Sequence, residues 1–135
     1  MSMLDMNVEE VEDLIVMPPE QYELKIANAE IKTYKGKDGK PDGSFLSLMF
    51  VFEDEENAAP VFHNLFLLNG SEDKQQKAGV QRRFKTFFQA FDLPLSGNFE
   101  MSEIKGQTGW ATVKVVPATD DFPEKNEVGR FIVPN

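Results

Sequence analysis

Six aromatic side chains that the expected core does not need are the residues of this chain best suited to bind a ligand. Tyr34 has lysines on both sides of it in the sequence, and Trp110 shares a predicted strand face with Lys114. Aromatic rings stack on nucleotide bases, at about 1–3 kcal/mol per base, while neighbouring cations follow the phosphates. The pattern therefore predicts a surface for single-stranded nucleic acid. The candidate residues are the aromatics Tyr34, Phe45, Phe62, Phe66, Trp110 and Phe122 and the bases Lys32, Lys35, Lys37, Lys40, Lys114, Lys125 and Arg130.

The same residues also allow interpretations without nucleic acid. Phe45, Phe62 and Phe66 would equally well cover a second small core under the N-terminal segment, with the lysines keeping the loops soluble. Rings that are exposed in a single copy of a protein are often buried when that copy joins an assembly. A protein-interaction or virion structural module is therefore an alternative. A small-ligand or oligosaccharide binder is a third, because rings stack on sugars. Arg82 and Arg83 are assigned to a solvated helix face.

The residue combinations that catalysis or a metal site would need do not occur in the sequence. His63 is the only histidine, cysteine is absent, and there is no phosphate-binding glycine motif. A nucleophile–base pair, a thiolate metal site and a nucleotide-binding loop are therefore not expected. The acidic run 53–56 is more typical of a solvated turn than of a cation site. We expect a non-enzymatic protein without cofactor or metal, in which His63 is an ordinary strand residue.

The net charge is −9, from 14 basic and 23 acidic residues among 135, which taken alone argues against a polyanionic ligand. The charge is unevenly distributed, because residues 1–21 contribute −6 and residues 53–56 contribute −4, which leaves +1 for the rest. We expect residues 1–19 to form a partly flexible acidic arm and residues 20–135 to form one domain. The arm would compete with DNA for the basic surface, recruit a replication partner, or only keep the protein soluble.

Alternating apolar and polar residues predict five short strands. The first begins near Tyr22 and changes phase between Ile26 and Ala29, which indicates a β-bulge. The others are expected at residues 45–52, 61–68, 109–116 and 127–133.

Between the third and fourth strands the apolar period becomes helical. Its stripe consists of Val80, Phe84, Phe87, Phe88 and Phe91, and it predicts an amphipathic helix that is capped by Ser71 and ends before Pro94. Three strands, a helix and two strands is the connectivity of the OB-fold, a five-stranded barrel whose closure hides the strand edges. We therefore expect a mainly β protein with an OB-fold barrel; a β-sandwich with an appended helix is the alternative.

Several segments, spread over nearly all of residues 18–134, resemble one family of phage-encoded proteins. Besides the helix, the resemblance lies in residues 18–32, 44–52, 61–69, 106–111 and 126–131. Members of this family, long catalogued as uncharacterised, look like single-stranded-DNA-binding proteins with an OB-fold. The chain departs from the family pattern at Gln21, which is usually glycine, and at Leu68, where a tryptophan is common.

The resemblance implies a protein that coats single-stranded DNA during phage replication or recombination, in the cytoplasm of the infected bacterium. Phage or host replication and recombination proteins would then be the partners of the acidic arm. The choice between DNA and RNA, and between a monomer and a homodimer, stays open. No apolar run is long enough for a signal peptide or a membrane span, so no membrane partner is expected.

Overall fold

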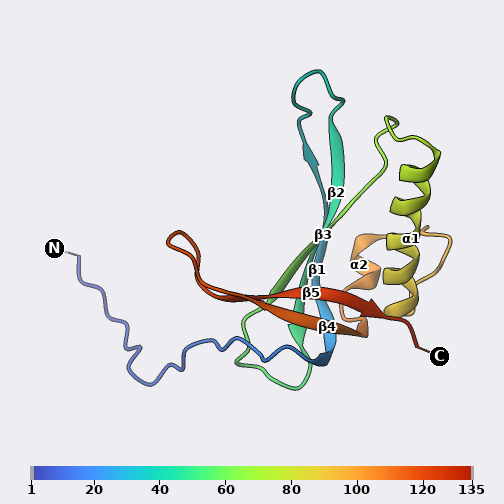
Figure 1. The fold of residues 1–135 in the computed structure, drawn as a ribbon. Coiled ribbons are helices and arrows are strands. Elements are labelled where there is room, and N and C mark those ends of the chain that lie inside the picture. The colour runs from blue at the N-terminus through green and yellow to red at the C-terminus, as the bar shows by residue number, and fades with distance from the viewer. Residues whose placement is uncertain (1, 135) are drawn as a thin grey trace.

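The computed structural model describes residues 2–134, which form five strands and two helices (Figure 1). In chain order the elements are β1 (Gln21–Tyr34), β2 (Gly43–Phe52), β3 (Val61–Phe66), α1 (Lys74–Ala90), α2 (Met101–Ile104), β4 (Thr108–Val116) and β5 (Lys125–Ile132). The five predicted strands and the helix after the third strand are confirmed. Strand ends differ from the prediction by at most two residues; β3, for example, ends at Phe66 rather than at residue 68.

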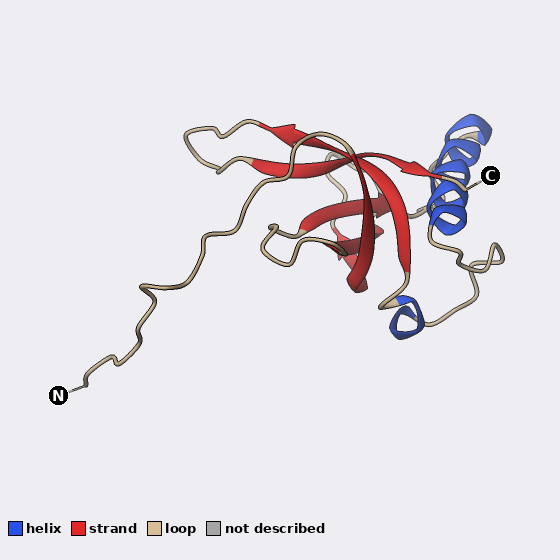
Figure 2. Cartoon of the chain, turned by 90° about the horizontal axis from the view of Figure 1, so that it is seen from below, coloured by secondary structure: helices blue, strands red, loops and turns tan. Residues whose placement is uncertain are grey.

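The strands form one antiparallel sheet in the order β3-β2-β1-β4-β5. The long strand β1 pairs with β2 over most of its length and with β4 at its beginning. The register shifts between Ile26 and Asn28, which confirms the predicted bulge. A bulge increases local twist, and the sheet is strongly bent in both ribbon views (Figures 1 and 2).

The edge strands β3 and β5 approach each other without forming a hydrogen-bonded ladder among residues 2–134. The rings of His63 in β3 and Phe131 in β5 lie 5.2 Å apart. The hydrogen-bonded sheet is therefore open, whereas the sequence predicted a closed barrel. Side-chain packing bridges the gap between its edges.

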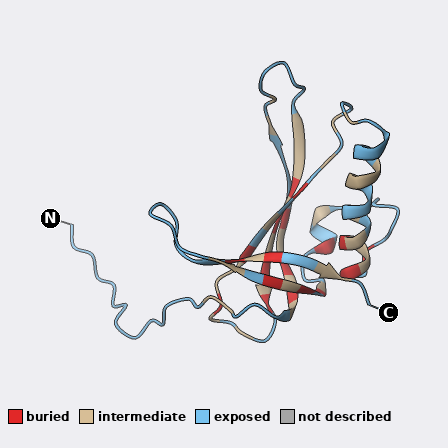
Figure 3. Ribbon diagram, in the orientation of Figure 1, coloured by how far each residue is buried: buried red, intermediate tan, exposed pale blue. Residues whose placement is uncertain are grey.

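The core lies between the inner face of the sheet and the two helices. Leu24, Ile26, Leu48 and Phe50 of the sheet are fully buried, and Phe50 stacks on Phe91 at 5.3 Å. Burying such a side chain contributes about 1.5–3 kcal/mol. Along β2 the buried residues Leu46, Leu48, Phe50 and Phe52 alternate with half-buried ones, as the predicted phase requires (Figure 3).

Helix α1 begins two residues later than expected. Asp73, not Ser71, is its N-cap, because the Asp73 carboxylate accepts a hydrogen bond from the Gln76 N–H at 2.8 Å while the Gln76 side chain accepts one from the Asp73 N–H. The Ser71 hydroxyl instead donates to the Asn69 side chain at 2.6 Å. The nearby acids Glu72 and Asp73 precede the helix, so its first turn carries no acidic residue. The four-residue helix α2, which buries Ile104, was not predicted.

The N-terminal arm is extended and exposed, but its last part is attached to the domain. Ile15 forms a parallel bridge with Ala58, and the Asn126 side chain exchanges two hydrogen bonds of 2.8 Å with the Met17 backbone. Residues 2–14 extend away from the sheet (Figure 1). No helix among the described residues is long and apolar enough to span a membrane.

Candidate nucleic-acid interface

The outer face of β2 and β3 carries a row of directly opposed side-chain pairs. Because side chains alternate along a strand, those of Phe45, Ser47 and Met49 share this face. The register pairs them with Phe66, Asn64 and Phe62, respectively. Phe62 is 63% exposed and Phe66 52% exposed. At about 3.3 Å per residue, these two rings are attached about 13 Å apart along β3.

At one end of this row three rings form an aromatic cluster, made of Tyr34, Phe45 and Phe66. Phe45 and Phe66 lie 5.5 Å apart, and Tyr34 lies 5.8 Å from Phe66 and 6.4 Å from Phe45. The Tyr34 ring rests directly on Gly43, its cross-strand partner, where any side chain would collide with it. The structure thus brings together three of the six predicted aromatics, with Phe62 farther along the same face.

Loop 35–42 extends beyond the cluster and holds three of the predicted lysines at its surface. The Lys40 N–H donates to the Lys37 carbonyl at 3.1 Å, with Asp38 and Gly39 between them at φ values of 55° and 80°. Two successive positive φ values are typical of a type I′ turn. The Asp42 carboxylate also accepts the Gly36 N–H at 2.9 Å. These bonds give the loop a defined shape that presents Lys37 and Lys40 to solvent.

The charges around the aromatic cluster are mixed, with a small excess of positive charge. Three lysines against two aspartates give loop 35–42 a net charge of +1. Lys35, Lys37 and Lys40 have no carboxylate within ion-pair distance among the described residues, whereas Lys32 lies 3.3 Å from Glu30. Such an exposed pair contributes little stability, so Lys32 is free to exchange Glu30 for a phosphate.

The acidic segments of the chain lie away from this cluster. The turn 53–56 follows the end of β2, and loop 35–42 precedes its beginning, so the ten-residue strand separates them by about 30 Å at 3.3 Å per residue. The arm contacts the chain directly after this turn, because the Asn57 side-chain amide donates a hydrogen bond to the Glu12 carboxylate at 2.8 Å. Most of the negative charge therefore lies at the end of β2 opposite the lysines.

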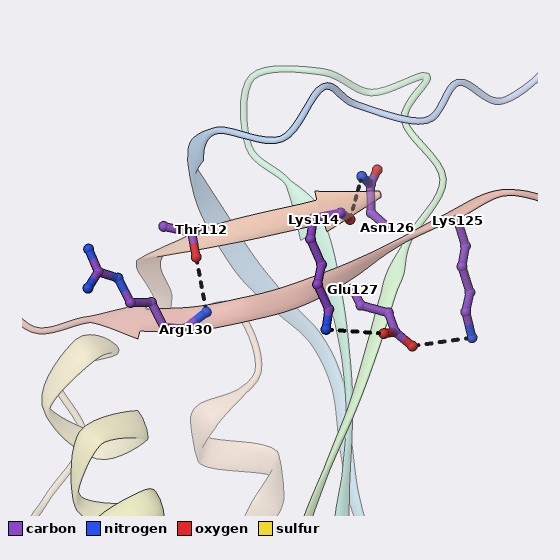
Figure 4. Close-up of polar contacts among 6 residues, drawn as sticks. All are labelled: Thr112, Lys114, Lys125, Asn126, Glu127 and Arg130. Atoms are coloured by element: carbon purple, nitrogen blue, oxygen red, sulfur yellow. Dashed lines mark hydrogen bonds and ion pairs between the residues drawn. The ribbon is translucent and has the colours of Figure 1, made fainter. Parts of the chain in front are cut away.

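The β4–β5 hairpin presents a different environment for its candidate residues. Lys114 and Lys125 both approach the Glu127 carboxylate, at 3.9 and 3.5 Å (Figure 4). Phe122 is exposed in a loop that also carries Asp120, Asp121 and Glu124. The hairpin thus combines its two lysines with an excess of carboxylates, which disfavours phosphate there.

Trp110 is also separate from the aromatic cluster. Its cross-strand neighbours are Glu23 and Ile132, and Glu23 is joined to Glu53 through a backbone hydrogen bond. The structure therefore places this ring at the acidic end of the sheet.

Arg130 belongs to a group of basic residues that the sequence did not reveal. A cleft of about 310 Å³ between α1 and the β3–β5 edges is lined by Arg82, Arg83, Arg130 and His63. None of these arginines has a carboxylate at ion-pair distance within residues 2–134. Burial lowers the pKa of His63, and Glu127 partly offsets this effect. The only sign of this basic group in the sequence is the pair Arg82-Arg83. The pair does not indicate that β5, which carries Arg130, packs beside the helix.

No protein-family model matches the chain, and a search of curated proteins finds no matching sequence. The geometry itself combines exposed rings, a shaped lysine loop and polar Ser47 and Asn64 between the rings. This combination suits a ligand with planar groups linked by anions.

Proposed function

We propose that this protein binds single-stranded DNA through the outer face of β2 and β3 and through loop 35–42. The observation that carries the proposal is the aromatic cluster of Tyr34, Phe45 and Phe66, which lies partly exposed beside unpaired lysines. The bases would stack on the cluster and on Phe62, while Lys35, Lys37 and Lys40 neutralise phosphates. No catalytic step is part of this function.

The strand order and the helix after β3 support an OB-fold relationship. OB-folds bind oligonucleotides on strands 2 and 3 and on the loops that flank them, and the aromatic cluster occupies that position in this chain. The barrel closure of that fold would be completed by packing between β3 and β5. With the resemblance in residues 18–134, this points to a phage protein that coats DNA during replication or recombination in the cytoplasm of the infected bacterium.

The carboxylates of the β4–β5 hairpin reduce the number of residues that we assign to the proposed DNA site. We assign the principal contacts to Tyr34, Phe45, Phe62 and Phe66 and to the lysines at residues 32–40. We assign only secondary DNA contacts to the residues that lie near carboxylates, which are Trp110, Phe122, Lys114 and Lys125. A DNA strand that continues from the aromatic cluster towards β5 would bring its phosphates to Arg130.

A fluorescently labelled oligothymidylate of about 20 nucleotides tests the proposal by anisotropy. With about four phosphates neutralised, affinity should fall about 50-fold between about 50 and 200 mM salt, because the logarithmic slope is about −0.7 per contact. The same oligomer in duplex form is the control and should bind more weakly, since its bases are not available to stack. Absence of binding at the lower salt concentration would contradict the proposal.

The alternative, a protein-interaction or virion structural module, draws on the same exposed rings. Phe62 and Phe66 are apolar enough to be buried in a subunit interface. Light scattering with and without the oligomer separates the two functions. A stable assembly that is indifferent to DNA, with Phe62 and Phe66 protected from solvent, would favour the module.

A further inference from the structure

An apolar groove on the other side of the molecule has no role in the proposed DNA site. It lies between α1, the inner face of the β1–β2 hairpin and the segment after α1, with a volume of about 840 Å³. Its lining includes Ile31, Leu68, Phe84, Phe88, Leu95 and Phe99. Ile31 is 56% exposed and Leu95 is 60% exposed. Exposed apolar surface of this kind marks a binding site more often than an isolated apolar residue does.

The acidic arm also exposes apolar side chains. The exposed apolar residues are Met3, Leu4, Met6, Val8, Val11 and Leu14. Between them lie the acids Asp5, Glu9, Glu10, Glu12 and Asp13. A segment that only kept the protein soluble would not need six large apolar side chains. The arm therefore has the composition of a ligand for an apolar groove with a basic border.

Helix α1 supplies such a border. It carries five basic residues and no acidic one. Lys77, Gln81 and Lys85 follow one another at four-residue spacing, so they form one row on the helix surface. Lys85 and Gln81 line the groove directly. The charges of the groove border and of the arm are therefore complementary.

The arm and the groove of one molecule lie on opposite sides. The arm is held at Ile15 and Met17 and runs away from α1 in both ribbon views (Figures 1 and 2). Residues 2–14 span up to about 45 Å when extended, which is enough to reach an adjacent molecule. The arm can bind the groove of a second molecule without a change in its direction, whereas it would have to turn back to reach the groove of its own molecule.

We propose that the arm of one copy binds the α1 groove of a second copy. Val8 and Val11 would enter the groove while the neighbouring carboxylates pair with Lys77 and Lys85. Each copy carries one arm and one groove, so the contact joins copies either by reciprocal exchange of arms in a two-fold dimer or head-to-tail in a chain. This association needs no DNA and stands apart from the proposed DNA-binding function.

A complementation experiment without DNA tests the proposal on the full-length protein. One variant lacks residues 2–13, and the other carries Leu95→Glu and Lys85→Glu in the groove. Wild-type mass should rise with concentration in sedimentation velocity, whereas each variant alone should stay monomeric. An equimolar mixture should form a 1:1 heterodimer and nothing larger, because only one arm and one groove remain. Lys105→Glu, an exposed charge reversal outside the groove, is the matched control and should assemble like the wild type.

Three outcomes would overturn the proposal. Assembly of either variant like the wild type would show that the arm or the groove is dispensable, and a monomeric mixture would show that they do not bind each other. A wild type that stays monomeric at every concentration would show that the arm does not join two copies. Circular dichroism of each variant confirms that it is folded.

A labelled peptide of residues 2–17 gives an independent measurement with the arm-deleted protein. Anisotropy should show saturable binding that weakens at least about tenfold when the peptide carries Val8→Ser and Val11→Ser, and likewise when the protein carries the two groove substitutions. Equal binding by the native and the serine peptide would overturn the proposed role of the apolar side chains.

Discussion

The rings of Phe45 and Phe66 lie 5.5 Å apart as a directly opposed pair on the outer face of β2 and β3. Neither ring belongs to the core of fully buried side chains. An aromatic pair contributes about 0.5–1.5 kcal/mol beyond burial, so the pair keeps its shape while one face stays accessible. A preorganised platform of this kind loses little entropy when a base stacks on it.

Phe66→Ala should weaken single-stranded DNA binding by about 5- to 150-fold, which corresponds to about 1–3 kcal/mol for one stacked base. Anisotropy with oligothymidylate measures this loss. Leu95→Ala, an exposed apolar residue on the opposite side, is the control for unspecific effects and should bind like the wild type. If Phe66→Ala binds as tightly as the wild type, the aromatic cluster is not the binding site.

Gly43→Ala should lower DNA affinity without removing any ring. The added Cβ would collide with the Tyr34 ring, so the ring must shift from its position in the aromatic cluster. The matched control is Gly79→Ala in α1, where an added Cβ meets nothing within 4 Å. This control should raise the free energy of unfolding by about 0.5–1 kcal/mol, because alanine favours a helix, and leave DNA binding unchanged. Urea titrations and anisotropy measure the two effects, and unchanged affinity in Gly43→Ala would count against Tyr34.

Replacement of Lys37 and Lys40 together by glutamine should weaken DNA binding and also reduce its salt dependence. Each lost phosphate contact should change the slope of log K against log salt by about 0.7. Lys114→Gln, whose lysine already faces Glu127, is the comparison and should change the slope less. Equal slopes for all three proteins would show that loop 35–42 does not contact the phosphates.

Asn126→Ala should release the arm from the domain. The Asn126 side chain holds both the N–H and the carbonyl of Met17, and leaving such groups unpaired costs about 1–3 kcal/mol. Limited proteolysis should cut the arm near residue 17 faster, while urea unfolding reports the loss of stability. Asn57→Ala, which removes only the exposed bond to Glu12, should have a smaller effect on both. Unchanged cleavage in Asn126→Ala would contradict the role of this contact.

The stability of the protein should fall when the pH drops from 7.5 towards 5.5. Burial lowers the pKa of His63 in the native state, whereas the unfolded chain keeps a value near 6.5. Below about pH 6.5 the unfolded state therefore binds a proton that the native state does not, and this favours unfolding. His63→Gln should remove this part of the pH dependence in urea titrations. An identical pH dependence in wild type and variant would refute the assignment.

The sequence alone was sufficient for the five strands, for helix α1 and for the faces that these elements bury. Strand phases, the bulge after Ile26 and the apolar stripe of α1 all follow from the spacing of residues close together in the chain. The N-cap was misplaced because Ser71 and Asp73 are both good capping residues. Only the local hydrogen bonds of Asn69 and Gln76 decide between them.

Which candidate residues meet was decided by the tertiary structure. The residue types made Tyr34 and Trp110 equally good candidates for stacking on a base. The tertiary structure places Tyr34 beside Phe66, whereas strand register places Trp110 opposite Glu23. Packing of α1 against β5 likewise brings Arg82 and Arg83 to Arg130. Local spacing reflects the repeat of a strand or a helix, which depends on neighbouring residues alone. Register and helix placement depend on contacts between segments distant in the chain, and these are formed only when the sheet bends and the core closes.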